Sequence, residues 1–408
     1  MSGSDHDERI NRRTALARGG AAALAASSLV RTATAATGGA DSKPEANENQ
    51  IREYLKTMLL TRDDVDLWLK RQAFPFNKYD AELGYLHIDR DFQEGLDGAF
   101  CRYRYDKLDA RRMFAHADEP CRINTYGNSF TSCEQVSDGE TWQEALAAHL
   151  SEPVRNFGIG GYSVYQAYLR MVREEQKAPA RCIIFNIFDD DHARNLHGWQ
   201  RFKFGVNRKS PNPTVPHVRV DLAAGKITDR PNPCPKPESM YDLCDLDRVY
   251  ALFRDDFYMH NKLMWAARKA KGEPVPPTDY DDQNLIKHGI FASTRIIERV
   301  NEFAKKNGKQ VLYVLSYGAY TIRQFIEKGV RFDQALVDYL KETKVPFVDL
   351  MQAHADDAAR FKGTPEEALK RYFIGHYNPL GNRFCAFAMK DALVRMLDPK
   401  PPAYTRPK

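Results

Sequence analysis

A serine in the first half of the chain stands where a nucleophile would suit an α/β protein. Ser129 lies in the stretch Ile123 to Thr131, where a short strand ends, Gly127 allows a sharp turn and a helix is about to begin. A hydroxyl at the carboxyl end of a strand faces the crevice in which open α/β sheets bind ligands. Backbone N–H groups at such a turn can bind negative charge that develops during a reaction. Ser129 is therefore a candidate nucleophile, although a Gly-x-Ser turn also occurs as plain structure.

The elements around Ser129 alternate between strands and helices. This rhythm implies a parallel sheet whose strands are joined by right-handed crossovers. The five expected strands end at Tyr126 or span Val154 to Phe157, Cys182 to Phe185, Val311 to Leu315 and Val345 to Val348.

The helices between them are recognised by their apolar faces. The first carries Trp142, Leu146 and Leu150, and the second carries Tyr165, Leu169 and Val172. The third carries Ile296, Ile297, Val300, Phe303 and Ala304 and ends at Gly308, the fourth lies around Phe332 to Leu340, and the last, after the final strand, carries Phe384, Phe387 and Ala388.

Residues 1–36 have the features of an export signal. Arg12 and Arg13 form a twin-arginine pattern, an apolar run from Gly19 to Val30 follows, and small residues up to Ala36 suit a signal peptidase. The sequence therefore predicts export by the twin-arginine machinery and a periplasmic or secreted location. No later apolar run reaches the roughly 18 residues that a membrane span needs, so we expect no span in the mature chain.

Three other segments fall outside the alternating pattern. Residues 37–115 are interpreted as a polar linker and an N-terminal extension, with a helix over residues 51–70, extended pieces such as Tyr85 to Ile88, and no chemistry of their own. Residues 197–285 form an insertion rich in Pro and aromatic residues, with a hairpin that turns at Ala223 to Gly225. This insertion either covers part of a binding site or is a surface elaboration. Residues 397–408 form a C-terminal tail.

Composition argues against several classes of partner. A formal net charge of +5 over 408 residues does not predict a nucleic-acid partner. The seven cysteines show no CxxC pair and no His-Cys metal spacing, and we expect no metal or cofactor. Cys234 and Cys244 could bridge their loop in an oxidising compartment, but twin-arginine cargo folds in the cytoplasm, which favours free thiols for most cysteines. The run Asp189 to His192 is interpreted as a hydrogen-bonded loop, because consecutive residues rarely converge on one ion.

Four short stretches occur in a characteristic order along the chain. They are Gly-Asn-Ser-Phe-Thr at 127–131, Asn-Phe-Gly-Ile-Gly-Gly-Tyr-Ser at 156–163, Asp-Asp-Asp-His-Ala-Arg-Asn at 189–195 and His-Tyr-Asn-Pro-Leu-Gly at 376–381. In this order, and on these elements, they resemble the SGNH, or GDSL-type, hydrolases over residues 116–396. The resemblance implies a three-layer, flavodoxin-like parallel sheet. It also implies acyl transfer to water through an acyl-serine intermediate, without a metal or organic cofactor.

The resemblance assigns roles to four residues of this chain. Ser129 matches the nucleophile and His376 matches the general base that takes its proton. Gly161 matches a glycine whose N–H is an oxyanion donor, and Asp190 stands at the position of the usual side-chain donor Asn. An ionised Asp accepts hydrogen bonds and cannot donate one, so Asp190 must be protonated or the oxyanion hole must rely on backbone donors.

Two further positions depart from the pattern of the family. Asn128 replaces the Asp that usually precedes the nucleophile, and Phe373 stands where the family commonly has the acid that orients the histidine. Two explanations of the missing acid stay open. Either a Ser-His dyad is helped by a backbone carbonyl, or an acid arrives from elsewhere, for which Asp349 at a strand's carboxyl end is a candidate.

Export and the many aromatic residues favour an exported esterase whose substrate is an ester on a carbohydrate, with acetyl or another short acyl group. Two alternatives remain. An O-acyltransferase would use the same Ser129 and His376 with an acceptor other than water, in a site that the insertion could keep dry. A non-catalytic carbohydrate-binding relative is suggested by Asn128, Asp190 and Phe373.

Overall fold

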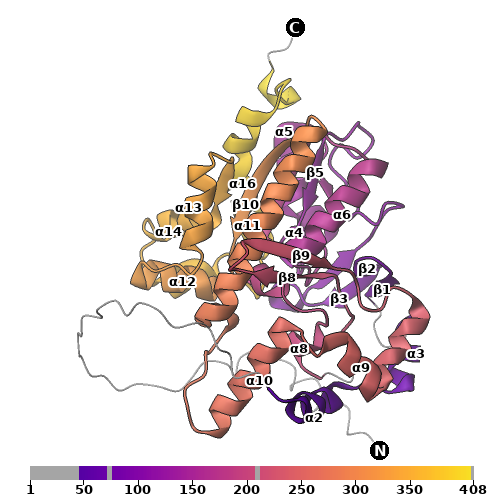
Figure 1. The fold of residues 1–408 in the computed structure, drawn as a ribbon. Helices are drawn as coiled ribbons and strands as arrows, with labels where there is room; N and C mark the ends of the chain where they lie inside the picture. Colours follow the sequence, from indigo (N-terminus) through magenta and orange to yellow (C-terminus); the bar gives the residue numbers. More distant parts are fainter. Residues whose placement is uncertain (1–45, 71–75, 207–211, 406–408) are drawn as a thin grey trace, which may run out of the picture. The chain divides into compact units, whose positions relative to one another are not determined.

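A five-stranded parallel sheet forms the centre of the folded chain (Figure 1). The computed structural model describes residues 46–70, 76–206 and 212–405, so the expected export signal and most of the linker lie outside the described residues. Numbered along the chain, the strands lie in the order 2-1-3-4-5, which is the flavodoxin-like doubly wound order. The expected fold class is therefore confirmed. Across the sheet the strands are β6 (Arg155–Asn156), β5 (Ile123–Tyr126), β7 (Cys182–Phe188), β10 (Gln310–Ser316) and β11 (Phe347–Asp349).

Helices cover both faces of this sheet. The connection from β5 to β6 runs in one direction across the sheet and the later connections run in the other, so right-handed crossovers place their helices on opposite faces. On one face α5 (Trp142–Leu150) packs against α16 (Pro379–Met396), and on the other α6 (Val164–Lys177) packs against α11 (Gln283–Lys306). This is the expected three-layer arrangement.

The two central strands explain the depth of the core. Residues 182–187 of β7 and 311–316 of β10 are all buried. A parallel strand covered by helices on both faces needs a continuous apolar run, which is the pattern seen in the sequence. Because the connections of β5 and β7 leave in opposite directions, a crevice forms between their carboxyl ends. The residues that follow β5 and β7 are therefore placed to form a site.

Several helices differ from the sequence-based expectation. The expected helix around Phe332 to Leu340 is α13 (Gln334–Glu342), but α12 (Ala319–Lys328), α14 (Leu350–Ala358) and α15 (Pro365–Lys370) were not predicted. The apolar face expected for α16 is also wrong, since Phe387 is 56% exposed. The helix instead buries Cys385, Met389 and Leu393, which follow one another at four-residue intervals and form a single stripe.

The N-terminal extension contains two helices and two hairpins. The single helix expected over residues 51–70 is wrong, because Thr61 caps a second helix with Asp64 in a capping box. The helices are α2 (Glu48–Met58) and α3 (Arg62–Leu69). The hairpins pair β1 (Asn77–Asp80) with β2 (Gly84–His87) and β3 (Arg90–Gln93) with β4 (Phe100–Tyr103).

The insertion holds the expected hairpin and more helix than predicted. β8 (His217–Asp221) pairs with β9 (Lys226–Arg230), and the main helices are α9 (Leu246–Phe253) and α10 (Phe257–Ala270). All seven cysteines are free, so the Cys234–Cys244 bridge is not formed. In the described ranges, no helix is both long and apolar enough to cross a membrane.

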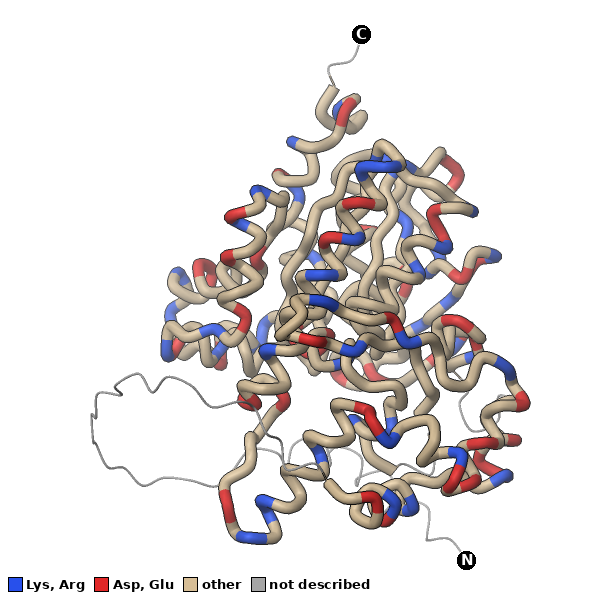
Figure 2. Tube along the Cα trace, in the orientation of Figure 1, with Lys and Arg blue, Asp and Glu red and all other residues tan. Residues whose placement is uncertain are grey.

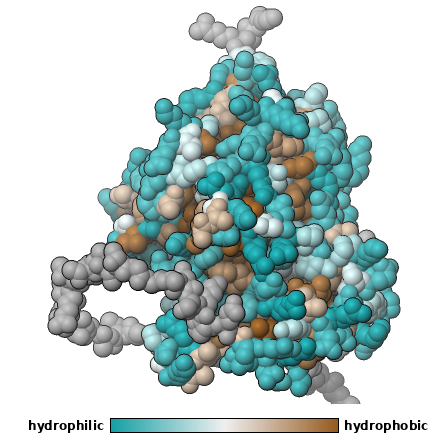
Figure 3. Space-filling view, in the orientation of Figure 1, coloured by the Kyte–Doolittle hydropathy of each residue, from teal (hydrophilic) through white to brown (hydrophobic). Residues whose placement is uncertain are grey.

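The described surface is mixed in charge and mainly hydrophilic. Basic and acidic residues are interspersed along most elements in Figure 2. On the face shown in Figure 3, hydrophilic side chains cover most of the described surface, with smaller apolar areas between them.

Candidate active site

Ser129 begins a single helical turn directly after β5. This turn, α4 (Ser129–Ser132), is capped by Asn128, whose side-chain oxygen accepts the Phe130 N–H at 2.9 Å. The replacement of the usual Asp by Asn128 therefore preserves the turn. Ser129 is 6% exposed and lies at the carboxyl end of β5, beside the crevice at the switch point of the sheet.

The structure brings Ser129 and His376 together. His376 lies in the loop between α15 and α16, and its Nε2 is 2.8 Å from the Ser129 Oγ. The ring of Phe130 packs against the imidazole at 5.0 Å between ring centroids. This geometry places a hydroxyl and an imidazole nitrogen within hydrogen-bond reach, which is an arrangement that can activate a serine.

Gln135 orients His376, and sequence reasoning did not find it. The Gln135 Oε1 accepts the backbone N–H of His376 at 2.6 Å and lies 3.3 Å from the imidazole Nδ1. The backbone N–H can only donate, so the amide oxygen must face His376. The proton then lies on Nδ1, and Nε2 presents its lone pair to the Ser129 hydroxyl. A neutral side-chain amide thus takes the orienting position, rather than an acid or a backbone carbonyl.

The N-terminal extension holds the segment that carries Gln135. We call residues 132–136 the catalytic turn. The Gln135 N–H donates to the Tyr103 hydroxyl at 2.7 Å, and the buried Arg111 guanidinium donates to the carbonyls of Ser132, Cys133 and Val136. The sequence predicts no chemistry for the extension, but its Tyr103 and Arg111 hold the catalytic turn in position.

The catalytic turn needs this support because its backbone is strained. Cys133 and Gln135 both adopt left-handed conformations, with φ of 58° and 70°. Such conformations cost non-glycine residues about 1–3 kcal/mol each and persist only where the surroundings impose them. Arg111 supplies these restraints and is itself paired with Asp138 at 2.8 Å. Cys133 is buried, and burial raises the pKa of its thiol to about 12, so it is not a competing nucleophile.

Gly160 lies directly against the catalytic turn, and Gly161 lies against Tyr85 and Gln200. A Cβ on Gly160 would lie 1.9 Å from the Glu134 Oε1, so a side chain there would displace the Glu134 carboxylate. Gly161 has a φ of +80°, which favours glycine, and a Cβ would lie 2.7 Å from the Tyr85 hydroxyl. The N–H groups of Ser129 and Gly161 donate to no other residue in the described ranges. Both are therefore free to bind a developing oxyanion.

Asp190 cannot be the side-chain oxyanion donor. Its carboxylate accepts hydrogen bonds from Arg194 at 2.9 Å and Lys203 at 2.7 Å. Burial alone would raise the pKa of Asp190, but these two cations outweigh burial and hold that pKa well below its ordinary value. An ionised carboxylate only accepts hydrogen bonds. Of the two possibilities for the oxyanion hole, the geometry supports backbone donors, and Asp190 ties the insertion to α7 (Asp191–Arg194).

Asp349 is also placed away from His376. Its Oδ2 pairs with Arg331, and its Oδ1 accepts the Met351 N–H at 3.1 Å as the cap of α14. It ends β11, the edge strand, which lies three strands and roughly 14 Å from β5 at the usual strand spacing. Asp349 is thus a structural residue. Phe373, at the position of the usual acid, packs its ring on Tyr377 at 4.7 Å.

A second residue that sequence reasoning missed is Glu134. Its Oε2 is 3.9 Å from the His376 Nε2, and its Oε1 is 3.7 Å from Arg90 and 3.9 Å from His87. Burial lowers the pKa of His376 below its ordinary value, Glu134 opposes this, and Arg194 and Arg90 lower the pKa further. The imidazole nitrogen that contacts Ser129 therefore also faces a carboxylate. The only sequence signal for both missed residues is their nearness to Ser129.

The acidic run after β7 distributes its side chains to separate partners. Asp189 accepts the Gly318 N–H and the Thr321 hydroxyl, Asp191 accepts from Asn128 at 2.8 Å, and His192 contacts a serine of α11. In the part of the chain that the structure describes, no three His, Cys, Asp or Glu residues cluster in a way that could hold a metal. The run is a hydrogen-bonded loop that links the first and third motifs.

Comparison with known proteins gives structural neighbours only. No family model matches the chain, and no curated protein matches its sequence. A lipolytic protein of the G-D-S-L family from Desulfitobacterium hafniense is 11% identical with a TM-score of 0.34, over 66% of this chain and 98% of that one. The acetyl xylan esterase AlAXEase is 13% identical with a TM-score of 0.35, over 67% and 99%. A GDSL-like lipase from Bacteroides thetaiotaomicron is 12% identical with a TM-score of 0.32, over 70% and 93%.

The names of these structures agree with the resemblance to SGNH, or GDSL-type, hydrolases seen in the sequence. All three identities lie below 25%, and all three TM-scores lie below 0.5. The functional argument therefore rests on the site of this chain itself.

Proposed function

We propose that this chain is an SGNH-type serine esterase that removes a short acyl group, such as acetyl, from a carbohydrate. The observation that carries the proposal is the 2.8 Å contact between the Ser129 Oγ and the His376 Nε2, with Nδ1 held by Gln135. A buried serine in this position has its proton within reach of a base of the correct tautomer.

The proposed reaction has two acyl-transfer steps. As the Ser129 Oγ attacks the carbonyl carbon of the ester, the His376 Nε2 takes the hydroxyl proton. The tetrahedral oxyanion accepts the N–H groups of Ser129 and Gly161. The proton on Nε2 then passes to the departing alcohol oxygen, which leaves an acyl-serine. A water molecule repeats the sequence, with Nε2 as its base, and releases the carboxylic acid and free Ser129.

Glu134 has a defined role in this proposal. When the His376 Nε2 takes a proton, the imidazole becomes a cation, and the neutral Gln135 cannot balance that charge. The Glu134 carboxylate, 3.9 Å from Nε2, supplies a negative charge on the side where the proton arrives. It acts through His376 and is a positioning residue for charge rather than a nucleophile. Its other oxygen lies 3.7 Å from Arg90, whose positive charge favours the ionised carboxylate, and 3.9 Å from His87.

The two alternative functions differ in what would support them. A non-catalytic relative would be favoured by a serine and a histidine too far apart to hydrogen-bond, and the 2.8 Å contact argues against it. An O-acyltransferase would use the same pair. It draws support from the insertion, because the Gln200 Nε2 lies 2.9 Å from the Tyr85 hydroxyl and 3.3 Å from the Gly161 oxygen. The insertion thus contacts the backbone of Gly161, whose N–H is one of the two proposed oxyanion donors.

The test is hydrolysis of 4-nitrophenyl acetate by the purified protein beside Ser129→Ala and His376→Ala. We expect activity in the parent that both substitutions abolish, and labelling of Ser129 by a fluorophosphonate. His116→Ala removes a partly exposed histidine outside the site and is the matched control, which should keep its activity. A folded parent with neither activity nor labelling would refute the esterase. Faster product formation on adding a sugar acceptor, with acyl transfer to it, would favour the acyltransferase.

The proposed location is the periplasm or the exterior of the cell, reached through the twin-arginine machinery. This proposal depends on residues 1–36, in which Arg12 and Arg13 form the recognition pair. Replacing both by Lys in a reporter fusion should retain the fusion in the cytoplasm. Export of the double variant at the parental level would contradict the proposal.

A further inference from the structure

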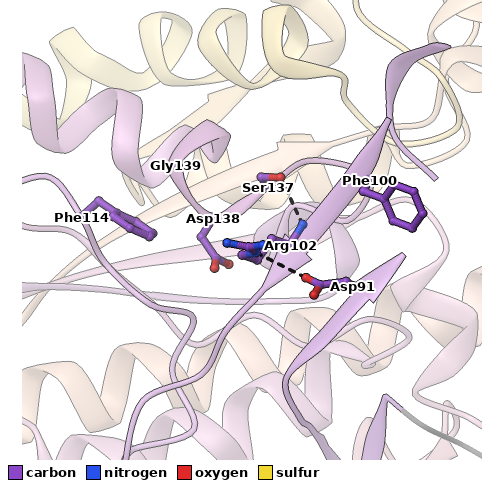
Figure 4. Close-up of a pocket in the computed structure, with 7 residues that line it drawn as sticks. All are labelled: Asp91, Phe100, Arg102, Phe114, Ser137, Asp138 and Gly139. Carbon is purple, nitrogen blue, oxygen red and sulfur yellow. Dashed lines mark hydrogen bonds and ion pairs between the residues drawn. The ribbon is translucent and has the colours of Figure 1, made fainter. Parts of the chain in front are cut away.

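A pocket of about 520 Å³ lies on the other side of β4 from the catalytic turn. Its walls include Asp91, Phe100, Arg102, Phe114, Ser137 and Asp138, and neither Ser129 nor His376 lines it (Figure 4). Its volume is in the range of small-molecule sites, which is about 300–1,000 Å³. The proposed esterase reaction makes no use of these side chains.

Strand β4 connects this pocket to the active site. Its side chains alternate, so that Phe100 and Arg102 are exposed while Cys101 and Tyr103 are buried. The inward-facing Tyr103 accepts the Gln135 N–H, and the outward-facing Phe100 and Arg102 line the pocket. One face of β4 therefore positions the proposed general base His376 through Tyr103 and Gln135, and the opposite face is free to bind a ligand.

The walls of the pocket are held in place before any ligand arrives. The Ser137 Oγ accepts the Arg102 N–H at 3.1 Å, and the Asp138 Oδ1 accepts the Arg104 N–H at 3.2 Å. The Phe114 N–H donates to the Glu144 carboxylate at 3.0 Å. A ligand would therefore lose little binding energy in ordering the backbone around it.

The pocket combines two exposed aromatic rings with an unpaired buried oxygen. Phe100 is 69% and Phe114 is 54% exposed, and they stand at opposite ends of the group, with polar side chains between them (Figure 4). The Asp138 side chain is only 3% exposed, and its Oδ2 has no hydrogen-bond donor in the described parts of the chain. Buried polar atoms are normally paired with protein or water, so this acceptor has room for one donor, from a water molecule or from a ligand that replaces it.

The charges around the pocket point to a neutral ligand. The Arg102 Nε lies 3.6 Å from the Asp91 Oδ1, and Asp138 is paired with the buried Arg111. The lining holds one cation, Arg102, and two carboxylates, Asp91 and Asp138, so its charge does not favour an acidic ligand. Rings that stack on the apolar face of a ligand, together with acceptors for its hydroxyl groups, suit a sugar.

We propose that this pocket binds neutral sugar residues of a glycan chain. The C–H face of one sugar residue packs on Phe100 and that of a neighbouring residue of the same glycan chain packs on Phe114, and hydroxyl groups between the two rings donate to Asp138 and Ser137. The identification of that glycan as the chain whose ester is cleaved at Ser129 rests on the proposed function. The binding itself does not, because it needs no catalysis.

The experiment measures glycan binding without turnover. The full chain carrying Ser129→Ala is titrated calorimetrically with cellohexaose, xylohexaose, mannohexaose and chitohexaose, and with hexagalacturonate as the acidic comparison. We expect binding of at least one neutral glycan. Added Phe100→Ala or Phe114→Ala should weaken it about tenfold, as removal of an aromatic anchor does, and Phe100→Trp should keep it. Phe387→Ala is the matched control, because Phe387 is 56% exposed on α16 outside the pocket.

Several results would overturn the inference. They are no binding to any of the four neutral glycans, equal affinity in the Phe100→Ala, Phe114→Ala and Phe387→Ala proteins, or stronger binding of hexagalacturonate. Sedimentation experiments in which the chain self-associates and Phe100→Ala abolishes this self-association would instead identify a second copy of the chain as the occupant of the pocket. Hydrolysis of 4-nitrophenyl acetate by the protein with Ser129 intact is scored separately, so failure of the esterase and failure of the sugar pocket remain distinguishable.

Discussion

Replacing Glu134 by Gln tests how the site controls the charge on His376. The change keeps the shape of the side chain that packs against Gly160 and removes only its negative charge. His376 must be neutral to take the proton of Ser129, so activity falls as the pH drops through the pKa of His376. Glu134 raises this pKa, whereas Arg194 and Arg90, the other charged groups that face the imidazole, lower it. Removing Glu134 therefore lowers the pKa further.

The size of the shift follows from the geometry. Two unit charges about 4 Å apart interact by about 1 kcal/mol in water and about 4 kcal/mol at an effective dielectric constant near 20. The side chains of His376 and Glu134 are 27% and 23% exposed, so solvent screens the pair and a value near the lower limit applies. One pKa unit corresponds to about 1.4 kcal/mol. We therefore expect the pKa of His376 to fall by about one unit in Glu134→Gln.

The assay is the pH dependence of kcat/KM for 4-nitrophenyl acetate, which reports the pKa of the free enzyme. In the parent, the acidic limb should lie below pH 6.5, because burial lowers the pKa of His376. In Glu134→Gln, this limb should move about one unit lower, while the plateau falls about tenfold because the imidazolium is less stabilised.

A matched control accompanies this measurement. Glu119→Gln also removes a carboxylate beside a histidine, 2.8 Å from the His116 Nδ1, but outside the site. It should leave the pH profile unchanged. An acidic limb that stays in place or moves to higher pH in Glu134→Gln would refute the electrostatic role of Glu134. A lower plateau with no shift of the limb would mean that Glu134 acts only through packing.

Three further changes test the other parts of the site. Gln135→Glu places a carboxylate at the Nδ1 of His376, now 3.3 Å from the amide oxygen, and should raise the acidic limb of kcat/KM by about one unit; a downward shift would contradict the assigned hydrogen bond. Gly160→Ala brings a Cβ to 1.9 Å from the Glu134 Oε1, and should lower kcat/KM with little loss of stability in urea unfolding; unchanged kinetics would show that Glu134 moves freely. Arg111→Met leaves the buried Asp138 carboxylate without its cation and removes the hydrogen bonds of Arg111 to the catalytic turn, so the free energy of unfolding should fall by about 3–5 kcal/mol. A loss below about 1 kcal/mol would mean that the catalytic turn keeps its conformation without Arg111.

The sequence determined the local elements and the principal residues of the site. The strands of the sheet follow from short apolar runs bounded by turn residues, because a strand covered on both faces needs such a run. The order of strands and helices predicted a parallel sheet with right-handed crossovers, and the resemblance to SGNH hydrolases implied its flavodoxin-like arrangement. The four motifs then assigned roles to Ser129, in the turn after one strand, to Gly161, in the loop after another, and to His376, in the loop before the last helix. Strands, helices and short motifs depend on residues that are close together in the sequence, so they can be recognised without a structure.

Some local expectations failed because packing, rather than periodicity, decided the outcome. Phe387 belongs to an apolar stripe of α16, but the adjacent stripe through Met389 faces the protein. The segment 51–70 has a helical pattern throughout, yet the cap at Thr61 divides it into two helices. In both cases two arrangements satisfied the pattern; packing against the rest of the chain selected one in α16, and the local capping box of Thr61 and Asp64 selected the other.

Only the tertiary structure decided how His376 is oriented and charged. Gln135 lies 241 residues before His376, and no spacing rule connects them. The extension contributes Tyr103 and Arg111 to the catalytic turn through contacts that leave no mark on periodicity. Asp190 had an open role until its ion pairs with Arg194 and Lys203 showed it to be an acceptor. A sequence reveals residue types and local backbone, whereas hydrogen bonds and pKa shifts depend on which distant groups the fold brings within a few ångströms of one another.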